Sequence, residues 1–125
     1  MRKMFFFSRP HKYQRYNTVG DYIDGHGATF FSISEMGNEQ YELLVAVHEL
    51  VEKILCDKRG ISTQSIDEFD MEFERRRQPD SDDEPGHDPS APYHREHVFA
   101  ERIERMLAEE LGVDWDEYDK AVTQL

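Results

Sequence analysis

The sequence predicts an α+β fold, with a small N-terminal antiparallel sheet followed by three to four helices. Aromatic and β-branched residues are concentrated between positions 4 and 34, as is typical of strands. From about position 39 the apolar residues recur at helical spacing instead. A chain of 125 residues is close to the usual size of one domain, so we expect residues 1–125 to form a single domain.

Three strands are expected in the N-terminal part. The apolar run Met4–Phe7 is too short for a secretory signal or a membrane span, and we interpret it as a strand. Asp24 and Gly25, followed by Gly27, form a strong turn signal between two further strands. These two strands are expected at residues 19–23 and 29–33. No membrane-spanning segment is expected in the chain.

Four helical segments are expected after the sheet, each with a capping residue or a stop signal. They run from Asn38 to Asp57, from Ser62 to the arginines at 75–77, from about Ser90 to Leu111, and from Asp114 onward. The first of them is apolar nearly all round its circumference. We therefore expect this helix to be central and buried.

Residues 78–91 separate the second and third helices and are rich in proline, glycine and acidic residues. This composition predicts a flexible acidic surface loop that links the helices without packing on them. An EF-hand is excluded, because Pro85 and Ala91 stand where the invariant glycine and the bidentate glutamate belong. A functional interpretation of the loop is a lid over a cleft between the first and third helices.

The formal net charge of −12 excludes direct binding to DNA or RNA as an expected function, because phosphate binding relies on lysine and arginine. The partners that remain are a protein or a peptide, since an acidic surface can also mimic nucleic acid. The single cysteine, Cys56, excludes an internal disulfide and indicates a reducing, cytoplasmic compartment. The sequence indicates no oligomeric state.

His48 and Glu52 lie one turn apart on the same face of the expected central helix. A buried carboxylate needs a cation, a set of hydrogen bonds or a metal, because burying an unpaired charge costs several kcal/mol. Side chains at i and i+4 point at a common spot, so we predict that both residues are metal ligands. The alternative is a core histidine that is hydrogen-bonded to Glu52 or to a backbone carbonyl, with a lysine or arginine pairing with the Glu52 carboxylate.

A third ligand is expected from the third helix, where His97, Glu101 and Glu104 form one stripe. We choose His97 as the third ligand, with Glu101 as the other metal-ligand candidate. His94 lies nearer the solvent side of the helix and ranks below His97. Glu49, about 100° from His48 on the helix, is predicted to be the general base, because it can reach a water at the site without being a ligand.

The string His48-Glu49-Leu50-Val51-Glu52 resembles the motif of the zincin metallopeptidases, in particular their minimal intracellular forms. The resemblance implies a zinc-dependent hydrolase, and a peptide bond as the substrate. Glu52 stands where zincins carry a second histidine, and a carboxylate ligand also admits manganese, iron or magnesium. The whole chain is similar to small uncharacterised bacteriophage proteins in the strings His48–Glu52, Glu84-Pro85-Gly86 and Ala91-Pro92-Tyr93, which implies the cytoplasm of a bacterial host.

Two other functions stay open. The acidic pairs Glu49/Glu52 and Glu101/Glu104 resemble those of all-α nucleotide pyrophosphohydrolases, which hold magnesium, although His48 and the sheet count against this. The third hypothesis is an acidic, phage-type binding protein that inhibits a host protein and uses the polar cluster for stability. An exposed acidic or apolar patch and the absence of an open metal position would favour that hypothesis.

Overall fold

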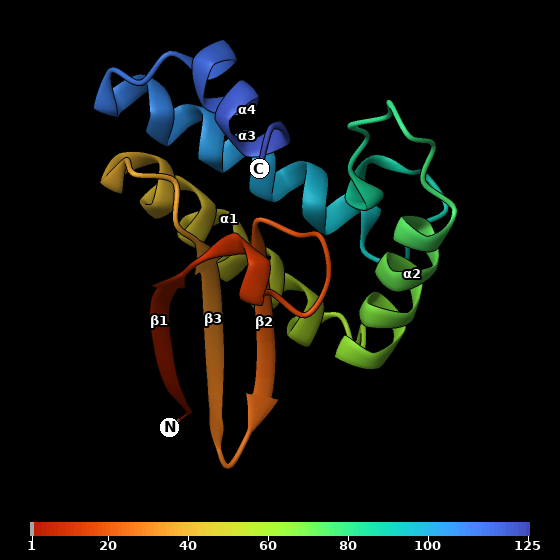
Figure 1. Cartoon of the computed structure of the whole chain (residues 1–125). Helices are drawn as coiled ribbons and strands as arrows, with labels where there is room; N and C mark the ends of the chain where they lie inside the picture. Colours follow the sequence, from red (N-terminus) through yellow and green to blue (C-terminus); the bar gives the residue numbers. More distant parts are fainter. Residues whose placement is uncertain (1) are drawn as a thin grey trace.

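The computed structural model describes residues 2–125 and has the predicted α+β fold, a three-stranded sheet followed by four helices (Figure 1). The strands are β1 (Lys3–Arg9), β2 (Gly20–Gly25) and β3 (Ala28–Ser34). The helices are α1 (Glu39–Lys58), α2 (Thr63–Arg75), α3 (His94–Leu111) and α4 (Trp115–Thr123), with single 3-10 turns at η1 (His11–Tyr13) and η2 (Pro85–His87). Among residues 2–125, none of the helices combines the length and apolar character that crossing a membrane requires.

The sheet is mixed, with β3 in the centre of the order β1-β3-β2. β2 and β3 form the predicted antiparallel hairpin, with Gly27 at a positive φ of 74° in its turn. β1 instead runs parallel to β3, from Lys3 opposite Ala28 to Arg9 opposite Ser34. The expectation of an antiparallel sheet therefore holds for the hairpin but not for β1, because the segment between β1 and β2 carries the chain past the end of β3.

Helix α1 lies between the sheet and α3, so its central position is confirmed (Figure 1). The predicted cap is also confirmed, since the Asn38 side chain accepts a hydrogen bond from the Tyr41 backbone N–H at 3.2 Å. One apolar cluster joins the sheet to α1 and α2 through Phe31, Cys56 and Ile66. A second joins α1 to α3 and α4.

The burial of α1 is one-sided. Leu44 and Val45 are buried, whereas Leu43 and Ile54 are 51% and 53% exposed. The apolar circumference of the helix predicted complete burial, but the sheet and α3 cover only part of it. One face of the central helix is therefore left as open apolar surface.

The segment at residues 78–91 packs against the fold, so the expectation that it only links two helices is wrong. Arg77 donates to the carbonyl oxygens of Ser81 and Asp83 at 2.8 and 2.7 Å, which folds the segment back on itself. Gly86 in η2 is buried against α3. Residues 90–93 form turns, so α3 begins at His94 rather than near Ser90.

Candidate metal centre

A cavity of about 190 Å³ lies between β2, α1, α2, α3 and the segment that leads to η2. Helix α1 contributes His48, Glu49 and Glu52 to its lining, and α3 contributes His97 and Glu104. The residues predicted as ligands thus come from two helices that pack against each other. Their convergence depends on the α1–α3 contact rather than on a loop.

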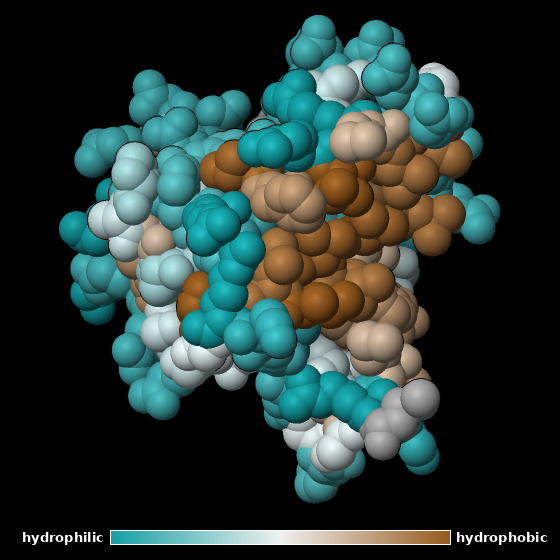
Figure 2. All heavy atoms as spheres, turned by 180° about the vertical axis from the view of Figure 1, so that it is seen from behind, coloured by the Kyte–Doolittle hydropathy of each residue, from teal (hydrophilic) through white to brown (hydrophobic). Residues whose placement is uncertain are grey.

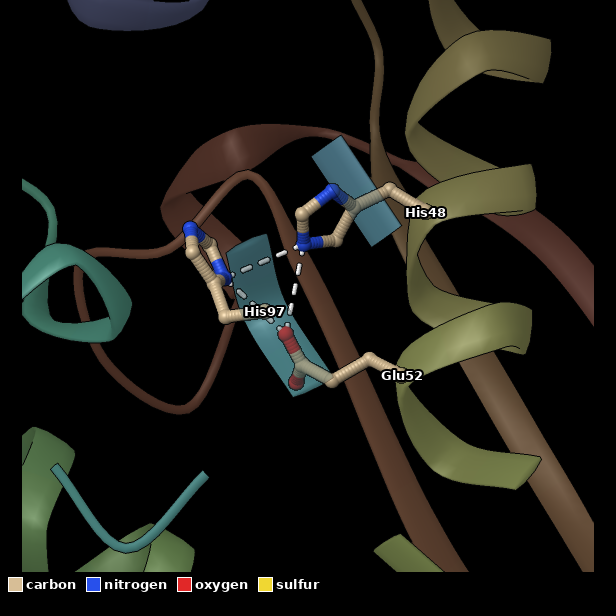
Figure 3. Close-up of side chains that lie close together, drawn as sticks. All are labelled: His48, Glu52 and His97. Carbon is tan, nitrogen blue, oxygen red and sulfur yellow. Dashed lines mark hydrogen bonds and ion pairs between the residues drawn. The ribbon is translucent and has the colours of Figure 1, made fainter. Parts of the chain in front are cut away.

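His48, Glu52 and His97 point one atom each at a common point (Figure 3). His48 Nε2 lies 3.2 Å from Glu52 Oε2 and 3.1 Å from His97 Nδ1. The third side of the triangle, from His97 Nδ1 to Glu52 Oε2, is 3.0 Å. All three residues are buried, with side chains 6–9% exposed. The structure therefore brings together three of the four predicted ligands.

Each imidazole is held from its far side by a second carboxylate. Glu104 Oε1 lies 2.7 Å from His48 Nδ1, and Glu84 Oε2 lies 3.1 Å from His97 Nε2. Tyr118 in turn donates its hydroxyl to the other oxygen of Glu104. A carboxylate that orients a histidine in this way is the usual outer partner of a metal ligand.

These outer bonds determine where the protons of the two imidazoles lie. A carboxylate only accepts, so His48 carries a proton on Nδ1 and His97 carries one on Nε2. In the neutral rings, His48 Nε2 and His97 Nδ1 are then bare lone pairs that face each other and a carboxylate oxygen of Glu52. Three acceptors at 3.0–3.2 Å from one another require a cation between them, either shared protons or a metal ion.

The donor set fits a metal by distance and by chemistry. Two nitrogens and one oxygen, each bound tetrahedrally at ~2.05 Å from a zinc ion, would lie ~3.3 Å apart. The observed separations of 3.0–3.2 Å are slightly shorter, so only a small outward shift of the side chains is needed. Three protein ligands leave a fourth position for water or substrate, which is the pattern of a catalytic rather than a structural zinc site.

Protons compete for the same positions. Burial alone would lower the pKa of His97, but its hydrogen bonds to Glu52 and Glu84 raise it to about 9. Burial likewise opposes protonation of His48, yet bonds to Glu104 and Glu52 raise its pKa well above the usual value. The two imidazoles in turn hold the pKa of Glu52 below that of a free carboxyl group, despite its burial. A proton on His97 is therefore favoured at neutral pH in the metal-free site, and a metal ion would have to displace it.

Glu49 lies beside this cluster and is itself half-buried. Its carboxylate forms no hydrogen bond or ion pair with any residue of the described chain. Neither of its oxygens is a fully buried atom without a hydrogen-bond partner. Gly20 makes room for it, because a Cβ at that position would lie 2.6 Å from Glu49 Oε1. Burial first, and then repulsion from Glu52, raise the pKa of Glu49 well above its usual value.

Glu101, the fourth predicted ligand, does not join the triangle. Its carboxylate accepts from His87 Nε2 at 3.1 Å, near the surface. His87 also belongs to a second, more exposed group with Glu84 and the Nε2 side of His97. The 3.8 Å separation of His87 from Glu84 makes that group looser than the first.

The core-histidine alternative is met only in part. His48 is bonded to Glu52, as that alternative expects. No lysine or arginine of residues 2–125 pairs with Glu52, whose remaining oxygen accepts from the Tyr22 hydroxyl at 3.0 Å. Lys53, the nearest lysine in sequence, turns instead to two aspartates at 2.7–2.8 Å. Among residues 2–125, the two imidazoles are the only groups bonded to Glu52 that can carry a positive charge.

Two functional positions were missed by the sequence interpretation. Glu84 lies in a segment without periodicity, so no pattern indicated that it would reach His97. Gly86 has a steric role, because a Cβ there would come within 2.3 Å of the His97 ring. Glu104 was seen in the stripe of the third helix, but its contact with His48 depends on the helix pairing.

Comparisons with known proteins add no relative: no protein-family model matches the chain, and neither do any curated protein or solved structure. The assignment of the site therefore depends on its geometry alone.

Proposed function

We propose that this chain is a metal-dependent hydrolase that binds one divalent ion through His48 Nε2, Glu52 Oε2 and His97 Nδ1. The observation that carries the proposal is the convergence of these three acceptor atoms at 3.0–3.2 Å, with each imidazole turned inward by an outer carboxylate. Two nitrogens and one oxygen favour zinc, and the oxygen ligand leaves manganese, iron or magnesium as weaker alternatives.

Glu49 is proposed as the general base. A divalent ion held at this site would supply Lewis acidity, which activates a water and polarises a carbonyl group. The Glu49 carboxylate faces the same cavity and has no other partner, so it is free to accept a proton from that water. Burial and repulsion from Glu52 raise the pKa of Glu49, which makes its carboxylate a stronger proton acceptor than an exposed one.

A peptide bond is the proposed substrate, on the strength of the zincin resemblance. The cavity of about 190 Å³ holds only a small part of a chain, so the substrate would extend beyond it. Asp82 and Asp83 at its border are exposed and favour a substrate with a cationic group near the cleaved bond. Cys56 is free and buried, which suits the reducing cytoplasm where we propose that the chain acts.

The test compares the zinc-loaded parent with Glu49→Gln on a library of internally quenched fluorogenic peptides. We expect the parent to cleave some of them, and the variant to be ~100-fold or more slower with unchanged zinc content, because general-base catalysis typically contributes that much. The matched control is Glu35→Gln, an exposed carboxylate outside the cavity. Equal cleavage by parent and Glu49→Gln would contradict the role of Glu49.

An acidic inhibitor protein is the second candidate function, and the open apolar face of α1 is the observation that favours it. An inhibitor of this kind would not need a metal ion with a free coordination position, whereas the hydrolase would. The magnesium pyrophosphohydrolase gains no support, because among residues 2–125 the acidic pairs of α1 and α3 do not gather into one group.

A further inference from the structure

A continuous apolar surface covers the outer side of α1 and reaches β1 (Figure 2). Its most exposed members on these two elements are Met4 and Phe6 on β1 and Leu43 and Ile54 on α1, which are 45–53% exposed. We call these four residues the β1–α1 face. Phe6 lies on the same side of the sheet as α1, because its ring stacks on that of buried Phe31 at 4.3 Å between centroids.

Two contacts show that β1 and α1 run side by side in opposite directions. Near one end, Ser8 Oγ donates to Glu42 Oε1 at 2.6 Å. Near the other, Arg2 donates to Asp57 Oδ2 at 3.0 Å. The β1–α1 face therefore joins a strand and a helix into one surface, and charged groups lie at its ends rather than across it.

β1 also has an unpaired backbone edge. Its only partner strand in the described chain is β3, and the residues Met4–Phe7 are 38–52% exposed. An edge strand of seven residues with an apolar centre and no proline or bulge is ready to pair with another strand. Natural proteins usually cover or interrupt such an edge.

The total exposed area of the fold is larger than that of an average folded monomer of this mass. Folded monomers of this mass usually expose ~7000 Å². The described structure exposes 7811 Å². The excess of roughly 800 Å² is similar to the area that each partner buries in a standard protein interface, so burial of one face would bring the exposed area to the usual value.

We propose that a second copy of this chain covers the β1–α1 face, with the two β1 strands pairing antiparallel about a two-fold axis. A partner must offer an unpaired strand edge and an adjacent apolar surface, and the chain presents both side by side, so the face is complementary to itself. The pairing would extend the sheet to six strands and leave the metal centre, which lies beyond β2, unobstructed.

Sedimentation equilibrium of the full chain at about 10–100 µM tests this proposal, independently of metal and activity. We expect twice the chain mass of 14.8 kDa. Added salt should strengthen the dimer, because it screens the repulsion between two chains of net charge −12.

Ile54→Glu places a charge in the interface. The dissociation constant of the dimer should therefore be about 100-fold higher, or more, than that of the parent. Phe6→Glu should act in the same way, but Ile54 is the safer position because it contacts solvent without stacking on the core. Met71→Glu is the matched control, a 44% exposed apolar residue on α2. Monomeric parent protein at 100 µM, or an Ile54→Glu variant that dimerises like the parent and keeps its helical circular dichroism, would overturn the proposal.

Discussion

Two buried carboxyl groups line the same cavity, and their surroundings differ in kind. Asp70 on α2 accepts hydrogen bonds from the hydroxyls of Tyr16, at 3.0 Å, and Tyr93. Burial raises the pKa of Asp70 to about 7, in spite of these bonds. Glu52 accepts from Tyr22 in the same way, but its second oxygen also faces two imidazole nitrogens.

The comparison shows that burial of a carboxyl group does not by itself indicate a metal site. At Asp70 the neutral donors already satisfy the group, and a proton removes its charge near neutral pH. At Glu52 the neighbouring nitrogens are acceptors unless they are protonated, because Glu84 and Glu104 occupy the donor sides of both rings. Only the second arrangement demands a cation.

The largest effect expected from this comparison is on metal affinity. Glu52→Gln should weaken zinc binding by about 100-fold or more, because it replaces a charged ligand with a neutral amide. Asp70→Asn should change zinc affinity by less than about threefold, since Asp70 contributes no atom to the triangle. Isothermal titration with zinc measures both, and similar losses in the two variants would remove the distinction between the two carboxyl groups.

The stability of the metal-free protein should depend on pH through Asp70 and through His97, one of the two imidazoles that face Glu52. Both folded-state pKa values are raised, so each group stabilises the fold below its unfolded-state pKa and loses that stabilisation as pH rises to the folded value. The loss falls between about pH 4 and 7 for Asp70, and between about pH 6.5 and 9 for His97. The loss is worth ~4 kcal/mol for Asp70 and ~3 kcal/mol for His97.

Chemical denaturation from pH 5 to 9 measures these losses. Asp70→Asn should remove the decline below pH 7 and keep the decline above it. Saturating zinc should remove the decline above pH 7, because the metal replaces the protons that His97 would otherwise lose. A metal-free protein whose stability rises between pH 7 and 9 would contradict the protonation states described for the site.

A smaller effect is expected from the glycine beneath His97. Gly86→Ala should push the imidazole out of position, because the new methyl group would overlap the ring, and zinc affinity should fall about 10-fold. Gly25→Ala is the control, since a Cβ there meets no atom within 4 Å. Unchanged zinc affinity in Gly86→Ala, measured by competition with a chromophoric chelator, would show that the loop does not constrain the site.

The smallest effect concerns Glu101, which the sequence interpretation placed among the ligands. Glu101→Gln should leave zinc affinity within about threefold of the parent value, because Glu101 contacts His87 rather than the triangle. The same titration checks this expectation. A loss as large as that of Glu52→Gln would mean that Glu101 binds the ion when it is present.

Local periodicity explains what could be predicted. The spacing of His48 and Glu52 on one helix places them on one face whatever the tertiary structure is, and the stripe of the third helix contains His97 for the same reason. Helix boundaries could be predicted from capping residues such as Asn38, because a capping side chain bonds to a backbone N–H only a few residues away.

Contacts between distant segments explain what was missed. The parallel pairing of β1 depends on the path of residues 10–19, and no local pattern encodes it. Glu84 reaches His97 from an irregular segment, so its role depends on how that segment folds back. Hydrophobicity also predicted burial for Ile54, but no element of residues 2–125 covers it and its side chain is 53% exposed.

The most direct test of the central claim is X-ray absorption spectroscopy of the full chain, purified without a metal-affinity tag and loaded with one equivalent of zinc. We predict one zinc ion per chain with two imidazole nitrogens and carboxylate or water oxygens at ~2.0–2.1 Å. The imidazole scattering should be lost in His48→Ala and His97→Ala variants that remain folded. A parent protein that retains no zinc, or zinc bound without imidazole, would contradict the assignment of the site.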